Sequence, residues 1–329
     1  MSATASPTPG ASNLSRVQLD FTAIAEPFPG DVFAARFRTM WPALREWFLR
    51  DGDAARPSYA AAQRALHSHV PELVPVWERM VELAGGGDAA ARMLSLYDPP
   101  PLMAGCSQAV IHGSLVRNYD YHPAKLEGTV LRSELTGRAV LGSSDCLWGL
   151  LDGINDAGLT VALAFGGRPV HEPGFGITLI VRYLLETCTT VPEAIATLRR
   201  VPVNAPYNLT LADAHGEAAT AYVGPDRAVG VSPAIATNHQ EHVEWEDYAR
   251  ATRTLERYAT LSSAHVDDFL APPLYATEYE RGFGTLYTAV YTPATRSLVY
   301  RWPHDEWALS LDAFTEGARS VRLTDGGPG

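Results

Sequence analysis

The chain has 329 residues, of which 46% are hydrophobic, so it can pack one large domain or two smaller ones around a core. Its 37 acidic residues outnumber its 26 lysines and arginines, and the net charge of -11 argues against binding to nucleic acid or an anionic membrane. The sequence has no run of eighteen apolar residues, and its N-terminus lacks the basic and apolar regions of a signal peptide. We therefore expect a globular, cytoplasmic protein.

The first hundred residues read mainly as helix. Residues 1–15 are rich in Ser, Thr, Pro and Ala, which predicts a disordered tail, and residues 16–105 are predicted to form a helical N-terminal segment. Apolar residues recur at spacings of three and four, which predicts the helices at 31–48, 58–69, 73–83 and 88–96. Pro42 should kink or restart the first of these helices.

A proline-rich stretch, residues 98–101, then leads into a strand-like sequence. Gly105 and Cys106 open the first strand, which turns at residues 112–114 and returns on a second strand carrying Arg117 and Asp120. A free thiol has a pKa near about 8.5, so a nucleophilic cysteine needs a base or a cation beside it. This hairpin could place a thiol next to a cation and a carboxylate.

The remainder of the chain alternates hairpins with helices. Strand pairs are predicted at 129–135 with 139–143, 148–154 with 159–165, 208–212 with 218–223, and 285–291 with 297–300. Helices are predicted at 176–188, 191–200 and 246–261. This order suits an α+β fold with two antiparallel sheets packed face to face and helices outside.

The three cysteines, Cys106, Cys146 and Cys188, are few, odd in number and without Cys-x-x-Cys spacing. This argues against a disulfide scaffold and against a zinc site. We expect no metal and no cofactor. A cysteine taken without its context is most often a small buried apolar residue, so only the context of Cys106 distinguishes it.

Gly-Cys at the start of a strand, with Arg-Asn-x-Asp on the returning strand, resembles the N-terminal-nucleophile (Ntn) hydrolases of the choloylglycine hydrolase and isopenicillin N acyltransferase group. Residues 153–159, Gly-Ile-Asn-Asp-Ala-Gly-Leu, and the pair at 237–238, Thr-Asn, match further segments of that group. The resemblance covers about residues 103–301. It implies a four-layer αββα sandwich over residues 106–329, preceded by the helical segment 16–105.

The resemblance also implies that Cys106 is the nucleophile, exposed when the precursor cuts itself between Gly105 and Cys106. Residues 16–105 would then stay bound as the smaller chain. Asp120 would bond the new α-ammonium of Cys106, and Arg117 would lie beside the thiolate. Because these two residues are three apart on one strand, regular alternation would put them on opposite faces, which implies a bulge or a strand end there.

The side-chain NH₂ of Asn238 corresponds to the group's donor to the oxyanion. A second donor in relatives is often an asparagine, but this chain has Ala164 followed by Phe165, so a backbone N–H of Ala164 could serve. An arginine on the following helix would complete the site, and Arg257 fits this role better than Arg250 or Arg253. The aromatic residues Phe165, Tyr119, Tyr121 and Tyr287 could line an acyl pocket, although such residues more often belong to the core.

These roles describe a self-activating enzyme. A terminal Cys106 would carry an α-amine with a pKa of about 7.7 to 8.0, suited to act as its own base. Gly105 has no Cβ to obstruct attack on its carbonyl. The expected activity is hydrolysis of a linear amide of a small N-acyl substrate through a Cys106 thioester. Transfer of the acyl group to an amine is the alternative, and the acyl group itself stays open.

Two other interpretations compete with this one. A papain-like enzyme would pair Cys106 with His239, although the sequence around Cys106 lacks that family's context and predicts a strand instead of a helix. A non-catalytic family member would bind a ligand through the same scaffold. The sequence leaves the oligomeric state open.

Overall fold

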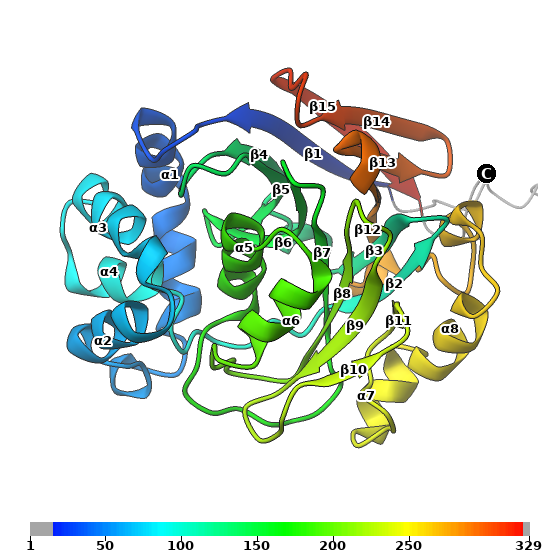
Figure 1. Ribbon diagram of the computed structural model, residues 1–329, viewed down its shortest axis with the longest axis horizontal. Coiled ribbons are helices and arrows are strands. Elements are labelled where there is room, and N and C mark those ends of the chain that lie inside the picture. Colours follow the sequence, from blue (N-terminus) through cyan, green and yellow to red (C-terminus); the bar gives the residue numbers. More distant parts are fainter. Residues whose placement is uncertain (1–15, 325–329) are drawn as a thin grey trace, which may run out of the picture.

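The computed structural model describes residues 16–324, and two sheets form its centre (Figure 1). The expected tail over residues 1–15 lies outside the described residues. The larger sheet has nine strands, in the spatial order β10 (Gly230–Ser232), β9 (Ala218–Val223), β8 (Tyr207–Ala212), β7 (Thr160–Phe165), β6 (Gly149–Asn155), β5 (Val140–Asp145), β4 (Thr129–Ser133), β1 (Arg16–Ala25) and β15 (Gly317–Thr324). The smaller has six strands, in the order β11 (Ile235–Ala236), β2 (Gly105–Ile111), β3 (Ser114–Tyr121), β12 (Gly284–Thr292), β13 (Ser297–Trp302) and β14 (Asp305–Ser310).

Helices cover both sheets from outside. Helix α5 (Ile177–Thr187) packs on β6 and β7, and α6 (Val191–Leu198) packs on β9. On the other side, α8 (Thr254–Leu261) packs on β2 and β11, and α7 (Glu246–Ala251) packs on α8. Strands β2 and β3 face β7 and β8 between these helix layers. The predicted αββα sandwich is therefore confirmed.

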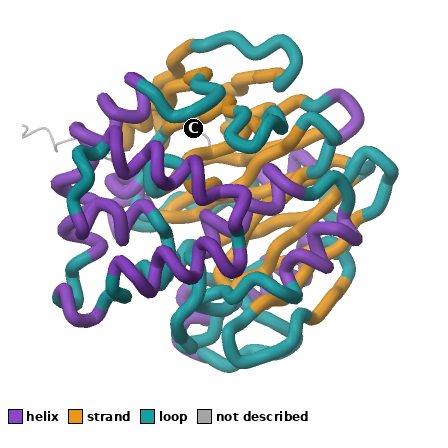
Figure 2. Tube along the Cα trace, turned by 60° about the vertical axis from the view of Figure 1, so that its left-hand side comes forward, coloured by secondary structure: helices purple, strands orange, loops and turns teal. Residues whose placement is uncertain are grey.

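The helices of the N-terminal segment form a group beside the sheets, in blue and cyan in Figure 1 and in purple at the front of Figure 2. They are α1 (Asp31–Phe48), α2 (Tyr59–His69), α3 (Val74–Leu83) and α4 (Asp88–Leu94). The group also reaches the sandwich, because the indole of Trp148 donates to the carbonyl of Leu94 and the hydroxyl of Tyr183 on α5 donates to Glu72. Helix α5 is therefore covered by the sheet on one side and by the N-terminal helices on the other, which explains why it is buried from Ile177 to Glu186.

Two features of this segment differ from expectation. Helix α1 continues through Pro42, so the expected restart is wrong, while a kink at Pro42 stays a prediction. Pro42 and Arg38 are both exposed, so water can bond the carbonyl that the missing N–H leaves free. The prediction of helix from residue 16 is wrong for β1, which pairs parallel with β4 and antiparallel with β15. Alternate residues of β1, among them Leu19 and Phe21, are buried, a two-residue period that is typical of a strand.

The single helix predicted over 246–261 is two helices. Arg253 separates α7 from α8 with a left-handed backbone, φ 51°. None of the helices within residues 16–324 is both long enough and apolar enough to span a bilayer.

Candidate active site

The β2–β3 hairpin sets the positions of the predicted site residues. Cys106 is opposite Tyr119, Gln108 is opposite Arg117, and Gly105 is opposite Asp120. Side chains of opposite residues share a face, so Cys106 and Arg117 point toward the nine-stranded sheet and Asp120 points away from it. The pairing of β2 with β3 is regular, and the irregularity in this region lies on β12, between Thr285 and Tyr287. Alternation therefore holds, and Asp120 lies near the strand end opposite the first residue of β2.

The sulfur of Cys106 is fully buried and accepts a hydrogen bond from NH2 of Arg117 at 3.3 Å. The same guanidinium lies 4.7 Å from the ring centre of Tyr119, and its Nε donates to the carbonyl of Leu163 at 3.0 Å. Burial raises the pKa of the Cys106 thiol, and the charge of Arg117 only partly opposes this effect. In the intact chain the thiol is therefore protonated at neutral pH.

A buried carboxylate on β6, Asp152, holds Arg117 in place. Asp152 forms an ion pair with NH1 of Arg117 and accepts from the hydroxyls of Tyr287 at 2.8 Å, Tyr291 at 2.6 Å, and Ser143. Both charged side chains have no exposed surface. Sequence reasoning missed Asp152. Its signal was an acidic residue within an apolar strand, because a charge in that position needs a partner.

The side chain of Asn238 forms hydrogen bonds with the residues on both sides of Gly105. Its Oδ1 accepts from the backbone N–H of Cys106 at 2.9 Å, and its Nδ2 donates to the carbonyl of Ala104 at 3.0 Å. Nδ2 also donates to the carbonyl of Phe165 at 3.0 Å. The backbone N–H of Asn238 is fixed by the hydroxyl of Thr254 at 2.8 Å. One amide side chain thus holds both sides of residue 105.

Arg257 is the arginine that the fold brings to this site. NH1 donates to the carbonyl of Cys106 at 2.6 Å, and NH2 donates to Oδ1 of Asn238 at 2.7 Å. Its Nε donates to the carbonyl of Thr252, just before the break between α7 and α8. The other two candidates face solvent, since the side chains of Arg250 and Arg253 are 70% and 48% exposed.

Asp120 lies beside Arg257 and not on the sulfur. Its Oδ1 accepts from the hydroxyl of Thr285 at 2.7 Å, and Oδ2 is 3.4 Å from NH1 of Arg257. Burial raises the pKa of Asp120, with Arg257 and Thr285 acting in the opposite direction. In the intact chain the backbone nitrogen of Cys106 bonds Asn238, so the structure does not place Asp120 on that nitrogen.

The stretch on β7 faces the site mainly through carbonyls, those of Leu163 and Phe165, which accept from Arg117 and Asn238. Ala164 is buried and lies opposite Asn208 on β8. The aromatic residues expected to line a pocket are core residues in the cases of Phe165, Tyr119 and Tyr287, whereas Tyr121 is half-buried.

Tyr248 on α7 is a site residue that sequence reasoning missed. Its hydroxyl donates to the carbonyl of Ala104 at 3.2 Å, and its ring packs edge-on against Phe165 with centroids 5.3 Å apart. Burial raises the pKa of this hydroxyl, and the neighbouring Cys106 raises it further. Tyr248 therefore contacts this segment as a neutral donor.

His239, the partner in the papain-like interpretation, is not brought to the sulfur. Its Nδ1 lies 3.2 Å from the hydroxyl of Thr237 and 3.1 Å from that of Thr254, and its ring packs on Tyr258. Burial lowers the pKa of His239. The group that contacts the thiol is Arg117, so the structure gives no support to a Cys–His pair.

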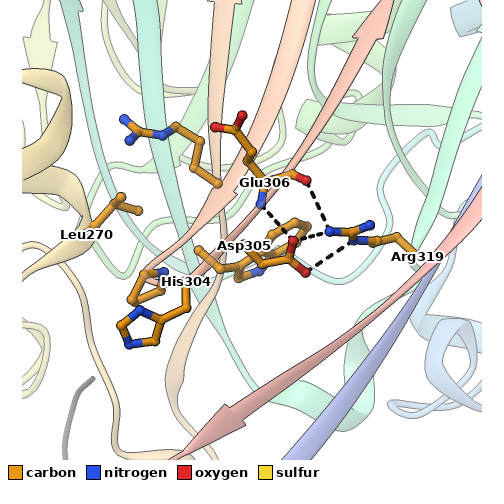
Figure 3. A pocket seen from close by; sticks show the side chains of 8 residues that line it. Leu270, His304, Asp305, Glu306 and Arg319 are labelled. Atoms are coloured by element: carbon orange, nitrogen blue, oxygen red, sulfur yellow. Dashed lines mark hydrogen bonds and ion pairs between the residues drawn. The ribbon is translucent and has the colours of Figure 1, made fainter. Parts of the chain in front are cut away.

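An open hollow of about 440 Å³ lies elsewhere, between β13, β14 and β15 (Figure 3). Strand β13 is three strands away from β2 in the six-stranded sheet, which corresponds to about 14 Å. Three of the charged groups that line the hollow form ion pairs, Asp305 with Arg319 and Arg301 with Asp267. This hollow is separate from the group of residues around Cys106.

Comparisons with known proteins assign the chain. The model of the family "Acyl-coenzyme A:6-aminopenicillanic acid acyl-transferase" matches residues 110–307, more than half of the sequence. The chain belongs to this family. It is thus an enzyme of the Ntn type, an amidohydrolase or acyltransferase that acts on acyl amides. The matched range begins four residues after Cys106.

Two solved structures are similar in part. A mutant of the conjugated bile acid hydrolase from Clostridium perfringens is 13% identical, with 65% of this chain and 96% of that chain covered and a TM-score of 0.44. Penicillin V acylase from Agrobacterium tumefaciens is 12% identical, with 66% and 90% covered and a TM-score of 0.39. No relative among the curated proteins matches the sequence. The assignment to the family therefore rests on the family match.

Proposed function

We propose that this family member is a self-processing amidohydrolase whose nucleophile is Cys106, matured by cleavage between Gly105 and Cys106. The observation that carries the proposal is the pair of contacts at Cys106. Its sulfur accepts a hydrogen bond from Arg117, and its backbone N–H donates one to Asn238. Cys106 is the second residue of β2. A cysteine that served only to fill the core would not need a buried guanidinium beside its sulfur.

Self-cleavage would begin with attack of the Cys106 sulfur on the carbonyl carbon of Gly105. The carbon–sulfur bond forms, the carbon–nitrogen bond breaks, and the thiol proton passes to the nitrogen of Cys106. This step frees the α-amine of Cys106. Water then hydrolyses the thioester to a free thiol and a carboxylic acid on Gly105, and the acid's proton passes to the α-amine. Asn238 supports this step by fixing residues 104 and 106 on either side of Gly105.

The mature residue would then carry its own base. The α-amine takes the thiol proton as sulfur attacks the substrate's amide carbonyl, and it returns that proton to the departing amine. Nδ2 of Asn238 is the candidate donor to the oxyanion, with the backbone N–H of Ala164 as the second. Arg117 stabilises the thiolate. Asp120, which is opposite Gly105 in the intact chain, is the nearest candidate to hold the ammonium once Gly105 has left.

The two fragments would remain together after cleavage. Strand β1 belongs to the smaller fragment, and its two neighbours β4 and β15 belong to the larger one. Mass spectrometry of the purified protein tests the proposal. We expect two fragments that separate between residues 105 and 106, and only the full-length chain for Cys106→Ala. Cys188→Ala is the control, because Cys188 is buried against Thr197 and should not affect cleavage.

An intact wild-type chain would contradict self-processing and favour a non-catalytic, ligand-binding member of the family. If the chain is cut, a library of N-acyl amides then identifies the acyl group, and Cys106→Ala should abolish turnover.

Acyl transfer is the second candidate, because the family description names an acyl-transferase. Hydrolysis and transfer share the thioester and differ in whether water or an amine attacks it. Adding hydroxylamine during turnover separates them. An enzyme built for transfer should form mainly the hydroxamate at acceptor concentrations where a hydrolase still forms mainly the free acid.

A further inference from the structure

Gly105 is pressed against the ring of Phe283. A Cβ at residue 105 would lie 2.6 Å from Cζ and 2.9 Å from Cε2 of Phe283, and 3.1 Å from Cβ of Asp120. Gly105 lies in β2 and is not among the residues with positive φ. The backbone at this position would accept any residue. Glycine is therefore needed here for space and not for conformation.

The backbone of Phe283 is fixed by the chain around it. Its backbone N–H donates to the carbonyl of Glu278 at 3.2 Å, and the preceding Gly282 has φ 73°. The next residue, Gly284, begins β12 and lies opposite Tyr121. Phe283 is half-buried, and its ring lies against residue 105 on the same side as Cβ of Asp120. A Cβ at residue 105 would therefore require the ring of Phe283 to shift.

The position of Gly105 also marks where a substrate must lie. In self-cleavage the Cys106 sulfur forms a thioester with the Gly105 carbonyl, and in turnover the same sulfur forms one with the substrate's carbonyl. The carbon next to that carbonyl, the α-carbon of the acyl group, would then occupy the place of the Gly105 Cα. This step rests on the proposed function.

We propose that Phe283 is a specificity-determining residue that disfavours acyl groups with an L-configured substituent on the carbon next to the reactive carbonyl. A substituent with the configuration of an L-amino acid at that carbon would point at the ring as a Cβ on residue 105 would. The substrate class is therefore amides of acyl groups that carry no L-configured substituent at the α-carbon. N-acylglycyl groups belong to this class and also match the contacts before Gly105, where Asn238 and Tyr248 both donate to the carbonyl of Ala104.

The first test uses self-cleavage, followed by mass spectrometry over time. Gly105→Ala should slow cleavage roughly ten- to a hundredfold, because an extra methyl in a packed site is costly. Adding Phe283→Ala to Gly105→Ala should restore most of the lost rate, and Phe283→Leu should restore part of it. Phe314→Ala is the matched control, since Phe314 is also half-buried but follows β14, and it should restore nothing.

The second test compares N-acetylglycyl and N-acetyl-L-alanyl p-nitroanilides, which differ by one α-methyl group. The cleaved wild-type enzyme should favour the glycyl compound in kcat/KM by a similar factor, and Phe283→Ala should reduce that preference. Three results would overturn the inference: wild-type cleavage rates in Gly105→Ala, no rescue by either Phe283 variant, or equal hydrolysis of both anilides. Each leaves the wild-type chain cleaved, whereas failure of the proposed function leaves it intact.

Discussion

Replacing Asp152 with asparagine isolates the charge that holds Arg117 beside the sulfur. The two side chains are of equal size, and the amide can turn its oxygen toward Arg117 and its NH₂ toward Ser143 and Tyr291. The hydroxyls of these two residues can rotate to accept, so most hydrogen bonds survive. The lost interaction is the ion pair, which has no exposed surface. A buried cation without its partner costs about 3–5 kcal/mol, and we expect the free energy of unfolding to fall by about that amount.

The measurement is urea unfolding followed by tryptophan fluorescence, with Cys106→Ala as the background so that every molecule is full-length. The control removes both charges, with Arg117→Met and Asp152→Leu together. This pair should be considerably more stable than Asp152→Asn alone, because no unpaired charge remains. A loss below about 1 kcal/mol for Asp152→Asn would refute the reasoning, since the Arg117 cation would then not depend on Asp152.

Three further outcomes follow from contacts at or near the site. Asn238→Ala should slow self-cleavage about a hundredfold and Tyr248→Phe much less, because Asn238 still holds Ala104 in the latter; gel time courses showing the opposite order would contradict this. Burial and a neighbouring carboxylate raise the pKa of Asp145 to about 7, so the folded protein keeps a proton that the unfolded chain loses near about pH 4. The free energy of unfolding should therefore fall as pH rises through this window, and urea titrations of Asp145→Asn should show a weaker dependence. Arg257→Lys should lower both stability and cleavage rate, whereas Arg253→Lys, on an exposed side chain, should change stability by less than about 0.5 kcal/mol.

Local patterns predicted most of the strands and helices, because each depends on a period of two or of about 3.6 residues within one segment. The Gly-Cys strand and its returning partner also predicted that Arg117 lies beside Cys106, since both belong to one hairpin, whereas Asp120 on the same hairpin points to the other face. Asn238 and Arg257 could be proposed only through the family resemblance, because they reach the site from other elements.

Asp152 and Tyr248 could not be found in this way. Their contacts depend on how the two sheets stack and on how α7 brings Tyr248 to Phe165, and a local sequence period predicts neither. Arg253 shows the same limit at a smaller scale. It has an ordinary helical sequence context, yet its left-handed backbone ends one helix and orients the next. Such breaks are fixed by tertiary contacts, here those of Arg257 with Thr252 and Asn238.

The place of β1 has a consequence for a protein that has been cut after residue 105. One strand of the nine would come from a separate polypeptide, inserted between β4 and β15. Renaturation would then be a second-order reaction, with a yield that falls on dilution. The uncut Cys106→Ala chain would regain its structure independently of concentration, so maturation would make recovery from the denatured state depend on the protein concentration.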